Sequence, residues 1–221
     1  MPLDQYELAH LAFEIERIDL GLPGGRQDQY SAAFGGTNFI EFLSNDRVIV
    51  NPLRFSGAIR NEFESSLVIC FCPGGRDANT IIAEQKAGLA GHNEATMAAM
   101  HRLRADATAM KNALLLGDIG GVARILEDSW KAKQLTASGI SNPRIDRLCE
   151  TAAANGAIAG KISGAGGGGC LMFIVPPEER LGVIGALNAA GGTAGPVKLT
   201  DAGVRDLAGK TDFARSNVLH I

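Results

Sequence analysis

Apolar and polar residues alternate along the chain at two spacings, one typical of helices and the other of strands. Between Leu8 and Ile15 the apolar residues lie three or four positions apart, which is typical of one face of a helix. Asp4 followed by Glu7 resembles a capping box at the start of this helix. We therefore expect an amphipathic helix over residues 5–20.

Short runs of apolar and β-branched residues predict strands. The first two runs are separated by the turn-forming residues 44–46, which favours a hairpin. The glycine-rich residues 191–195 are interpreted as a loop before the last strand. The predicted strands lie at residues 37–43, 47–52, 67–72, 157–163, 170–175 and 196–200.

Helical spacing dominates most of the remaining sequence. Asn142 followed by Pro143 predicts the start of one helix, and Asp77 is a plausible N-cap of another. The predicted helices lie at residues 78–134, with breaks at 88–92 and 117–121, and at 143–155 and 177–190. This order of elements predicts an α+β fold, in which helices cover one face of an antiparallel sheet.

A glycine-rich segment separates two of the predicted strands. Residues 161–170 read Lys-Ile-Ser-Gly-Ala-Gly-Gly-Gly-Gly-Cys, and the near absence of Cβ atoms lets backbone N–H groups approach an anion closely. A strand follows where a dinucleotide-binding motif needs a helix, and no Gly-Lys-Ser/Thr closes a Walker A loop. The segment indicates a phosphate-binding loop between strands; the alternative is a glycine-rich hairpin without a ligand.

The composition excludes several classes of protein. The 221 residues are 46% hydrophobic and 20% charged, with a formal net charge of −3, and no basic stripe indicates nucleic-acid binding. No apolar run has membrane-spanning length, and the N-terminus lacks a secretory signal. We therefore expect a cytoplasmic protein with neither nucleic acid nor membrane as partner, and with buried, reduced thiols at Cys70, Cys72, Cys149 and Cys170.

Three segments together resemble the GHMP superfamily of small-molecule kinases. Residues 161–170 resemble its third signature motif, and residues 138–143, Ser-Gly-Ile-Ser-Asn-Pro, add to the likeness. Residues 16–36 contain Gly-Gly-Arg-Gln-Asp-Gln-Tyr and Phe-Gly-Gly, and are similar to the sugar kinases of the superfamily, above all the heptose 7-phosphate kinases. The resemblance implies an incomplete N-terminal domain at residues 1–60, a ferredoxin-like C-terminal domain at 61–205 and a tail at 206–221.

The resemblance also implies a reaction and a set of site residues. The reaction is ATP-dependent phosphorylation of D-glycero-D-manno-heptose 7-phosphate at its anomeric hydroxyl, which gives the 1,7-bisphosphate. Asp28 takes the position of the catalytic aspartate, and Glu16 that of a magnesium ligand; one carboxylate accepts the hydroxyl proton while the other holds Mg²⁺. The implied substrate-binding residues are Arg26, Gln27 and Lys161, and those for the phosphates of ATP are Ser163, Gly164, Ala165, Gly166, Gly167 and Gly168.

Simpler interpretations exist for several of these residues. Glu16 could be an exposed charge at a helix end, and Asp28 could bond its own backbone on the loop that is expected to carry residues 26–28. Lys161 could be a solvated lysine beside a strand, and Asn142 is expected to cap a helix rather than to bind substrate. A galactokinase-like or fucokinase-like kinase is the alternative within the superfamily.

Two elements of the superfamily pattern are missing from this sequence. Members carry a first motif for the substrate and a second segment of the form Pro-x-x-x-Gly-Leu-Gly-Ser-Ser, which wraps the phosphates of ATP, and the 221 residues contain neither. Because positioning and electrostatics supply most catalysis of phosphoryl transfer, we expect this chain alone to be a poor catalyst. The alternative is a non-catalytic protein that binds a sugar phosphate or a partner. Unpaired edges of the predicted hairpin favour a homo-oligomer, or a separate chain that supplies the missing part.

Overall fold

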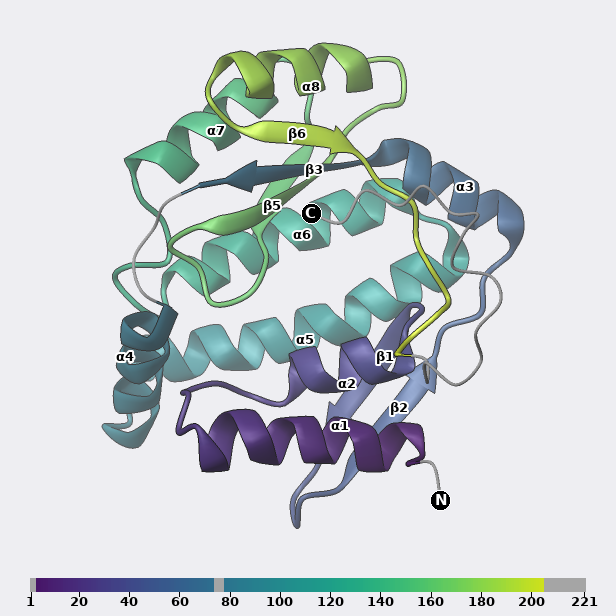
Figure 1. Cartoon of the computed structure of the whole chain (residues 1–221). Coiled ribbons are helices and arrows are strands. Elements are labelled where there is room, and N and C mark those ends of the chain that lie inside the picture. Colours follow the sequence, from purple (N-terminus) through teal and green to yellow (C-terminus); the bar gives the residue numbers. More distant parts are fainter. Residues whose placement is uncertain (1–2, 74–77, 205–221) are drawn as a thin grey trace.

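The computed structural model describes residues 3–73 and 78–204, which form a smaller N-terminal part below a larger second part (Figure 1). The predicted helix over residues 5–20 is confirmed, but its last turns are wound as a π-helix. The predicted cap Asp77 and the tail at 206–221 lie outside the described residues. The elements of the N-terminal part are α1 (Gln5–Phe13), the π-helix η1 (Glu14–Asp19), α2 (Gln27–Phe34), β1 (Asn38–Phe42) and β2 (Val48–Pro52).

Aromatic contacts join the elements of the N-terminal part. The ring of Tyr6 on α1 meets the ring of Phe34 on α2 edge to face, with 4.8 Å between centroids. The hydroxyl of Tyr6 also accepts a hydrogen bond from the Val50 amide on β2 at 3.1 Å. β1 and β2 form the predicted hairpin, whose turn contains Asn45 and Asp46 at positive φ, a conformation that these residue types tolerate.

The second part contains a four-stranded antiparallel sheet in the order β4-β5-β3-β6. The sheet and its helices confirm the predicted α+β class. The elements are α3 (Gly57–Ser66), β3 (Leu67–Cys72), α4 (Ala78–Ala90), α5 (Glu94–Leu116), α6 (Ile119–Gln134), α7 (Pro143–Ala154), β4 (Ala159–Ile162), β5 (Gly169–Ile174), α8 (Arg180–Ala189) and β6 (Thr193–Pro196).

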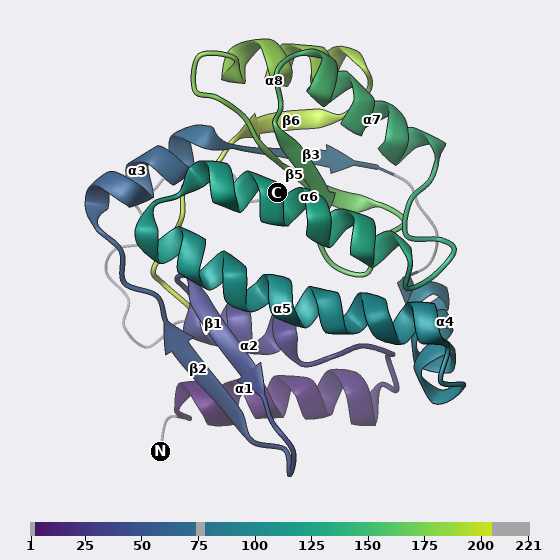
Figure 2. The same cartoon turned by 180° about the vertical axis from the view of Figure 1, so that it is seen from behind.

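Helices pack against both faces of this sheet, whereas the sequence analysis predicted one covered face. Alternate strand residues such as Val68 and Phe173 point toward α7 and α8 and form the larger core. Their neighbours Leu67 and Ile174 point the other way and join a second core with α5 and α6. The views from both sides place α7 and α8 on one side of the sheet and α6, with α5 beyond it, on the other (Figures 1 and 2). The physical reason is the near-continuous apolar run of β3, which is typical of a strand buried on both faces.

The last strand lies earlier in the sequence than predicted. β6 occupies part of the segment interpreted as a loop at 191–195, and its residues pair with β3. The amide of Ala194 donates to the Asn188 side chain at 2.7 Å, and a Cβ at Gly192 would collide with Cys70. A glycine is therefore required just before β6, and the small residues of the strand carry almost no apolar signal of their own.

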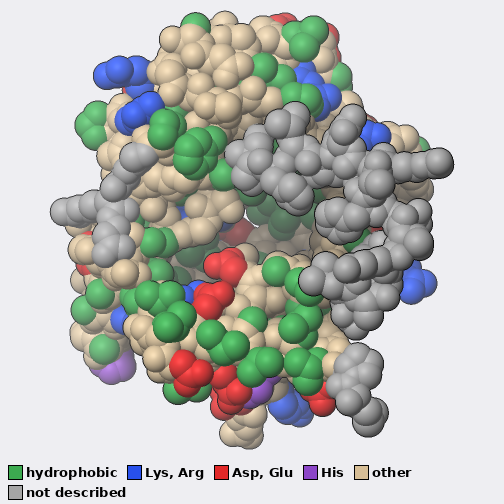
Figure 3. Space-filling view, viewed as in Figure 1, with side chains coloured by type: hydrophobic (Ala, Val, Ile, Leu, Met, Phe, Trp, Pro, Cys, Tyr) green, Lys and Arg blue, Asp and Glu red, His purple; other side chains and the backbone are tan. Residues whose placement is uncertain are grey.

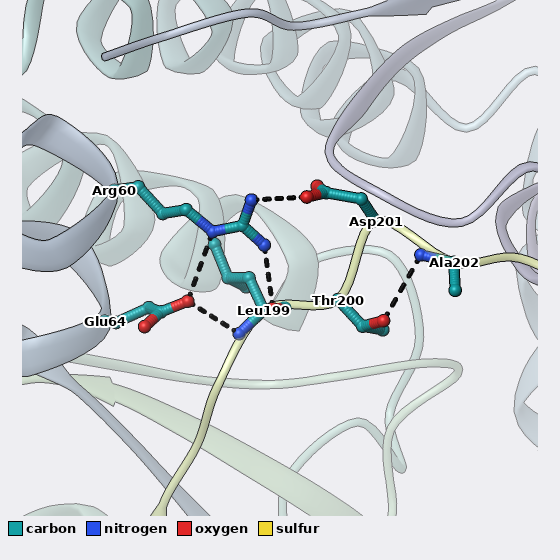
Figure 4. A network of polar contacts seen from close by, with 6 residues as sticks. All are labelled: Arg60, Glu64, Leu199, Thr200, Asp201 and Ala202. Atoms are coloured by element: carbon teal, nitrogen blue, oxygen red, sulfur yellow. Dashed lines mark hydrogen bonds and ion pairs between the residues drawn. The ribbon is translucent and has the colours of Figure 1, made fainter. Parts of the chain in front are cut away.

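Residues 197–204 return from the sheet to the N-terminal part, and we call this segment the strap. Its carbonyl at Thr200 accepts from the amide of Gly36 at 3.0 Å, and its amide at Val204 donates to a carbonyl of α2 at 3.0 Å. Arg60 of α3 donates to the carbonyl of Leu199 and to Asp201, each at 2.7 Å, as Figure 4 shows. The strap thus fastens the second part to α2.

The thiols differ in exposure, and all four are free. Cys70 and Cys72 are buried as predicted, but Cys149 is half-buried and Cys170 is exposed. Burial raises the pKa of Cys70 to about 11 and that of Cys149 to about 12, so both thiols stay protonated at neutral pH. Within the described ranges, no helix combines the length and the apolar composition required to cross a bilayer.

Candidate phosphate-binding and catalytic site

The glycine loop, residues 163–168, connects β4 to β5 and is held in place from one side. The amide of Gly167 donates to the carbonyl of Ile140 at 2.9 Å, and the carbonyl of Gly167 accepts from the Asn142 side chain at 2.9 Å. Gly166 has a φ of +114°, and a Cβ there would lie 3.0 Å from the backbone of Ile140. A glycine is therefore required at this contact.

Asn142 links this loop to the start of α7. Its side-chain oxygen accepts from the amides of Arg144 and Ile145 at 3.0 and 3.1 Å, which confirms the predicted N-cap. Its side-chain nitrogen is the group that holds the carbonyl of Gly167. The segment Ser-Gly-Ile-Ser-Asn-Pro therefore acts as a support for the loop.

Four backbone amides of the glycine loop make no hydrogen bond to any described residue. They belong to Gly164, Ala165, Gly166 and Gly168. Gly167 was also predicted to bind phosphate, but its amide is already bonded to Ile140. It therefore fixes the loop in place and is not free to donate to a phosphate. The Ser163 amide is also bonded, to the carbonyl of Cys170 at 2.7 Å. Consecutive free N–H groups of this kind form a concave site for an anion.

Two lysines, the buried Lys133 and the half-buried Lys161, lie beneath the loop. Lys161 is within β4, where its ammonium donates to the hydroxyl of Ser129, so it is not the solvated lysine of the simpler interpretation. Lys133 of α6 donates to the carbonyl of Gly164 and is 9% exposed. Burial, and then the nearby charge of Lys161, lower the pKa of Lys133 to about 8; burial also lowers the pKa of Lys161, opposed by Asp106.

Asp28 and Gln27 lie in the first turn of α2, and not on a loop as predicted. Both side chains are exposed, and within the described part of the chain neither has a hydrogen-bond partner. Arg26 precedes the helix, where its guanidinium bonds to Asp46 of the hairpin and lies 4.7 Å from the ring centroid of Phe13. Arg26 therefore braces the N-terminal part, while Asp28 keeps an unengaged carboxylate in a helix turn that favours negative charge.

Glu16 lies within the π-helix η1, beside α2. Its carboxylate accepts a hydrogen bond from the Gln29 side chain at 2.8 Å and forms an ion pair with Arg17 at 3.3 Å. The oxygen of the Gln29 side chain is buried, and no described residue donates a hydrogen bond to it. A buried acceptor next to a carboxylate fits a cation, although no group of three or more His, Cys, Asp or Glu gathers within residues 3–73 and 78–204.

A hollow lies between the two parts of the molecule. The space-filling view shows the surface hollowed between the layer of the sheet and the layer of α1 and α2, with acidic side chains on the α2 side (Figure 3). The glycine loop descends from β5 toward the same region (Figure 1). The fold thus places the layer of α1 and α2 opposite the layer that carries the glycine loop.

Sequence reasoning missed Lys133 and Gln29. The only signal for Lys133 is its helical spacing, three and four positions after Trp130 and Ser129, which puts it on the buried face of α6. Gln29 lies beside Asp28 in the motif, but its burial depends on the packing of α2 against α1. The burial of both residues therefore depends on tertiary contacts that the local sequence does not reveal.

Comparison with known proteins adds relatives of this chain. Residues 109–193 match the family described as "GHMP kinases C terminal". The D-glycero-alpha-D-manno-heptose 7-phosphate kinase of Campylobacter jejuni is 45% identical over 205 residues, which are 93% of this chain and 60% of that enzyme.

Two solved structures are similar over the same extent. A D-glycero-D-manno-heptose 1-phosphate kinase from Bacteriodes thetaiotaomicron has 41% identity and a TM-score of 0.68, and the match covers 92% of this chain and 55% of that one. A putative sugar kinase from Campylobacter jejuni has 42% identity and a TM-score of 0.69, covering 93% and 58%. The chain therefore spans less than two thirds of the length of these relatives.

Proposed function

We propose that this chain acts as an ATP-dependent kinase of a sugar phosphate, because residues 109–193 match the family of GHMP kinase C-terminal domains and the chain is similar to heptose-phosphate kinases in sequence and structure. The observation that carries the proposal is the glycine loop with four free amides, in a chain that is 45% identical to a heptose 7-phosphate kinase. Free amides of this kind suit the charged oxygens of a phosphate group.

In the proposed reaction, Asp28 is the base. Its carboxylate accepts the proton of the sugar hydroxyl while the hydroxyl oxygen bonds to the γ-phosphorus of ATP. The bond from that phosphorus to the bridging oxygen breaks, and ADP leaves. The free loop amides stabilise negative charge on the transferred group, because they are oriented before the reaction begins.

We propose Glu16 and the side-chain oxygen of Gln29 as the residues that hold Mg²⁺. The partnerless buried oxygen of Gln29 supports this choice, and phosphates usually complete the oxygen shell of this ion. When bound, Mg²⁺ supplies charge neutralisation at the phosphates. Among the predicted substrate ligands, Gln27 is exposed and unengaged, whereas Arg26 and Lys161 already contact other side chains.

The proposed substrate is D-glycero-D-manno-heptose 7-phosphate, phosphorylated at the anomeric hydroxyl to the 1,7-bisphosphate. One relative is named as a 7-phosphate kinase and another as a 1-phosphate kinase, so the position of the substrate phosphate is the point to test. A galactokinase-like or fucokinase-like activity is the alternative, and it predicts turnover of an unphosphorylated sugar.

The test is an ADP-release assay of the 221-residue chain with Mg·ATP and, in turn, heptose 7-phosphate, heptose 1-phosphate and galactose. We expect slow turnover with heptose 7-phosphate, because the 221 residues contain no segment that wraps the phosphates of ATP, and a further loss of roughly 100-fold or more in Asp28→Asn. Glu62→Gln, an exposed carboxylate on α3, is the control and should leave the rate unchanged. Calorimetric binding of the sugar phosphate without turnover would favour the non-catalytic alternative.

We also propose a domain division and a partner. The predicted boundary at residue 60 falls inside α3, which continues directly into β3, so we place the boundary at residues 53–56 and keep 206–221 as a tail. A two-stranded sheet is marginal by itself, so we propose that strands of a second copy or of another chain pair with β1 or β2. A single monomer mass by light scattering, unchanged up to high protein concentration, would argue against a second copy.

A further inference from the structure

Placing two lysines beneath the glycine loop costs folding free energy. Within the described ranges, neither Lys133 nor Lys161 forms an ion pair. Asp106 is the carboxylate that raises the pKa of Lys161, but it is paired with Arg102 at 2.7 Å. A buried ammonium without a paired carboxylate is costly, so a gain elsewhere must offset the cost.

The contact of Lys133 fixes the orientation of one peptide group. Its ammonium binds the carbonyl oxygen of Gly164, which belongs to the same planar unit as the amide of Ala165. In a trans peptide the C=O and N–H bonds point in opposite directions. When Lys133 holds the oxygen on the side of α6, the free N–H of Ala165 must therefore point to the opposite side.

A second contact has the same geometry at the other end of the loop. The side chain of Asn142 holds the carbonyl of Gly167, so the free N–H of Gly168 points away from Asn142. Side chains thus hold two carbonyl oxygens of the loop, and each of these hydrogen bonds sets the direction of the free amide that follows the carbonyl.

We propose that Lys133 is a positioning residue for phosphate binding, which aims the Ala165 amide at the ligand and places a positive charge beneath the loop. This inference rests on the proposed function, because it concerns the same loop. Lys133 acts through the Gly164–Ala165 peptide. The structure gives it no contact that would make it a catalytic residue. The charge beneath the loop also explains why a lysine, rather than an uncharged donor, stands at this buried position.

The experiment measures binding of inorganic pyrophosphate to the full chain by calorimetry, and hydrogen exchange of the loop amides without ligand. The variants are Lys133→Met, Lys133→Arg and Lys131→Met. Lys131 is the matched control because it lies on the same helix, but it is exposed and pairs with Glu127 at 2.9 Å.

We expect Lys133→Met to weaken pyrophosphate binding by roughly tenfold or more and, by loosening the loop, to speed exchange of the bonded Gly167 amide, with Lys133→Arg retaining part of the affinity. Lys131→Met should remain within about twofold of the wild type. Unchanged affinity in a folded Lys133→Met protein overturns the inference, as does a wild type that does not bind pyrophosphate.

Failure of this inference and failure of the proposed function give different results. If the wild type phosphorylates heptose 7-phosphate and Lys133→Met keeps both kcat and the KM for ATP, the function stands and the inference fails. If pyrophosphate binding depends on Lys133 but no sugar is phosphorylated, the inference stands and the proposed function fails.

Discussion

Replacing Lys133 by Met should stabilise the folded chain at neutral pH. Burial and Lys161 lower the pKa of Lys133 from 10.5 to about 8, which corresponds to about 3 kcal/mol of unfavourable free energy for the charged form. The variant also loses the hydrogen bond to Gly164, worth about 1 to 2 kcal/mol. We therefore expect the free energy of unfolding to rise by about 1 to 2 kcal/mol at pH 7.

The sign of this effect depends on pH. Below pH 8 Lys133 is charged in both the folded and the unfolded chain, so the wild type bears the full cost of the buried charge. Between pH 8 and 10.5 the unfolded chain binds more protons than the folded one, so the wild type gains stability by about 1.4 kcal/mol per pH unit. The advantage of the Met variant should therefore disappear near pH 9 to 10.

Urea denaturation at pH 7, 8, 9 and 10 measures this effect. The only tryptophan, Trp130, is buried on α6 close to Lys133 and reports the transition by its fluorescence. Lys131→Met is the control and should change stability by less than about 0.5 kcal/mol at each pH. A Lys133→Met protein that is less stable than the wild type at pH 7, or a difference that does not vary with pH, would refute the reasoning. Loss of phosphate binding together with a gain in stability would be a trade-off between function and stability.

Three further substitutions test the supports of the site. Gly166→Ala places a Cβ against the backbone of Ile140 at positive φ and should cost about 2 kcal/mol or more in urea denaturation, whereas an unchanged midpoint would contradict the role of this contact. Asn142→Ala removes the cap of α7 and the anchor of the loop, so we expect about 1 to 2 kcal/mol lost and faster exchange of loop amides; a loss of stability without faster exchange would limit its role to capping. Arg60→Met releases its bonds to the strap, and faster proteolysis within residues 197–204 is expected; equal cleavage rates would show that other contacts suffice.

Local sequence signals predicted much of this fold. The hairpin at β1 and β2, the strand β3 and the helix breaks near Gly117 followed from apolar periodicity and turn residues, because local chemistry determines them. β6 was misplaced because its small residues pair only where β3 already offers an edge. The second covered face of the sheet was missed because periodicity does not reveal which helix will lie against it.

In the candidate site, too, some residues were predicted from local sequence signals and others depend on tertiary contacts. The glycine loop and Asp28 were visible as motifs, since unusual residue types stand close together in the sequence. The Gly/Pro-rich turn before residue 26 gives no signal for where α2 begins, so Asp28 was predicted to lie on a loop. The hydrogen bond from Lys133 to the carbonyl of Gly164 joins residues that lie 31 positions apart, and no local sequence pattern predicts it.

The strap has a consequence for the order of events during synthesis. Arg60 and Asp201 are 141 positions apart, and the backbone bonds of Gly36 and α2 to the strap span similar distances along the chain. The helices α1 and α2 leave the ribosome before the strap, yet their fastening to the sheet requires this segment, which emerges after β6. The hollow that the two parts share can therefore close only after residue 204 has been synthesised, and a chain released at Pro196 would hold its sheet without this fastening.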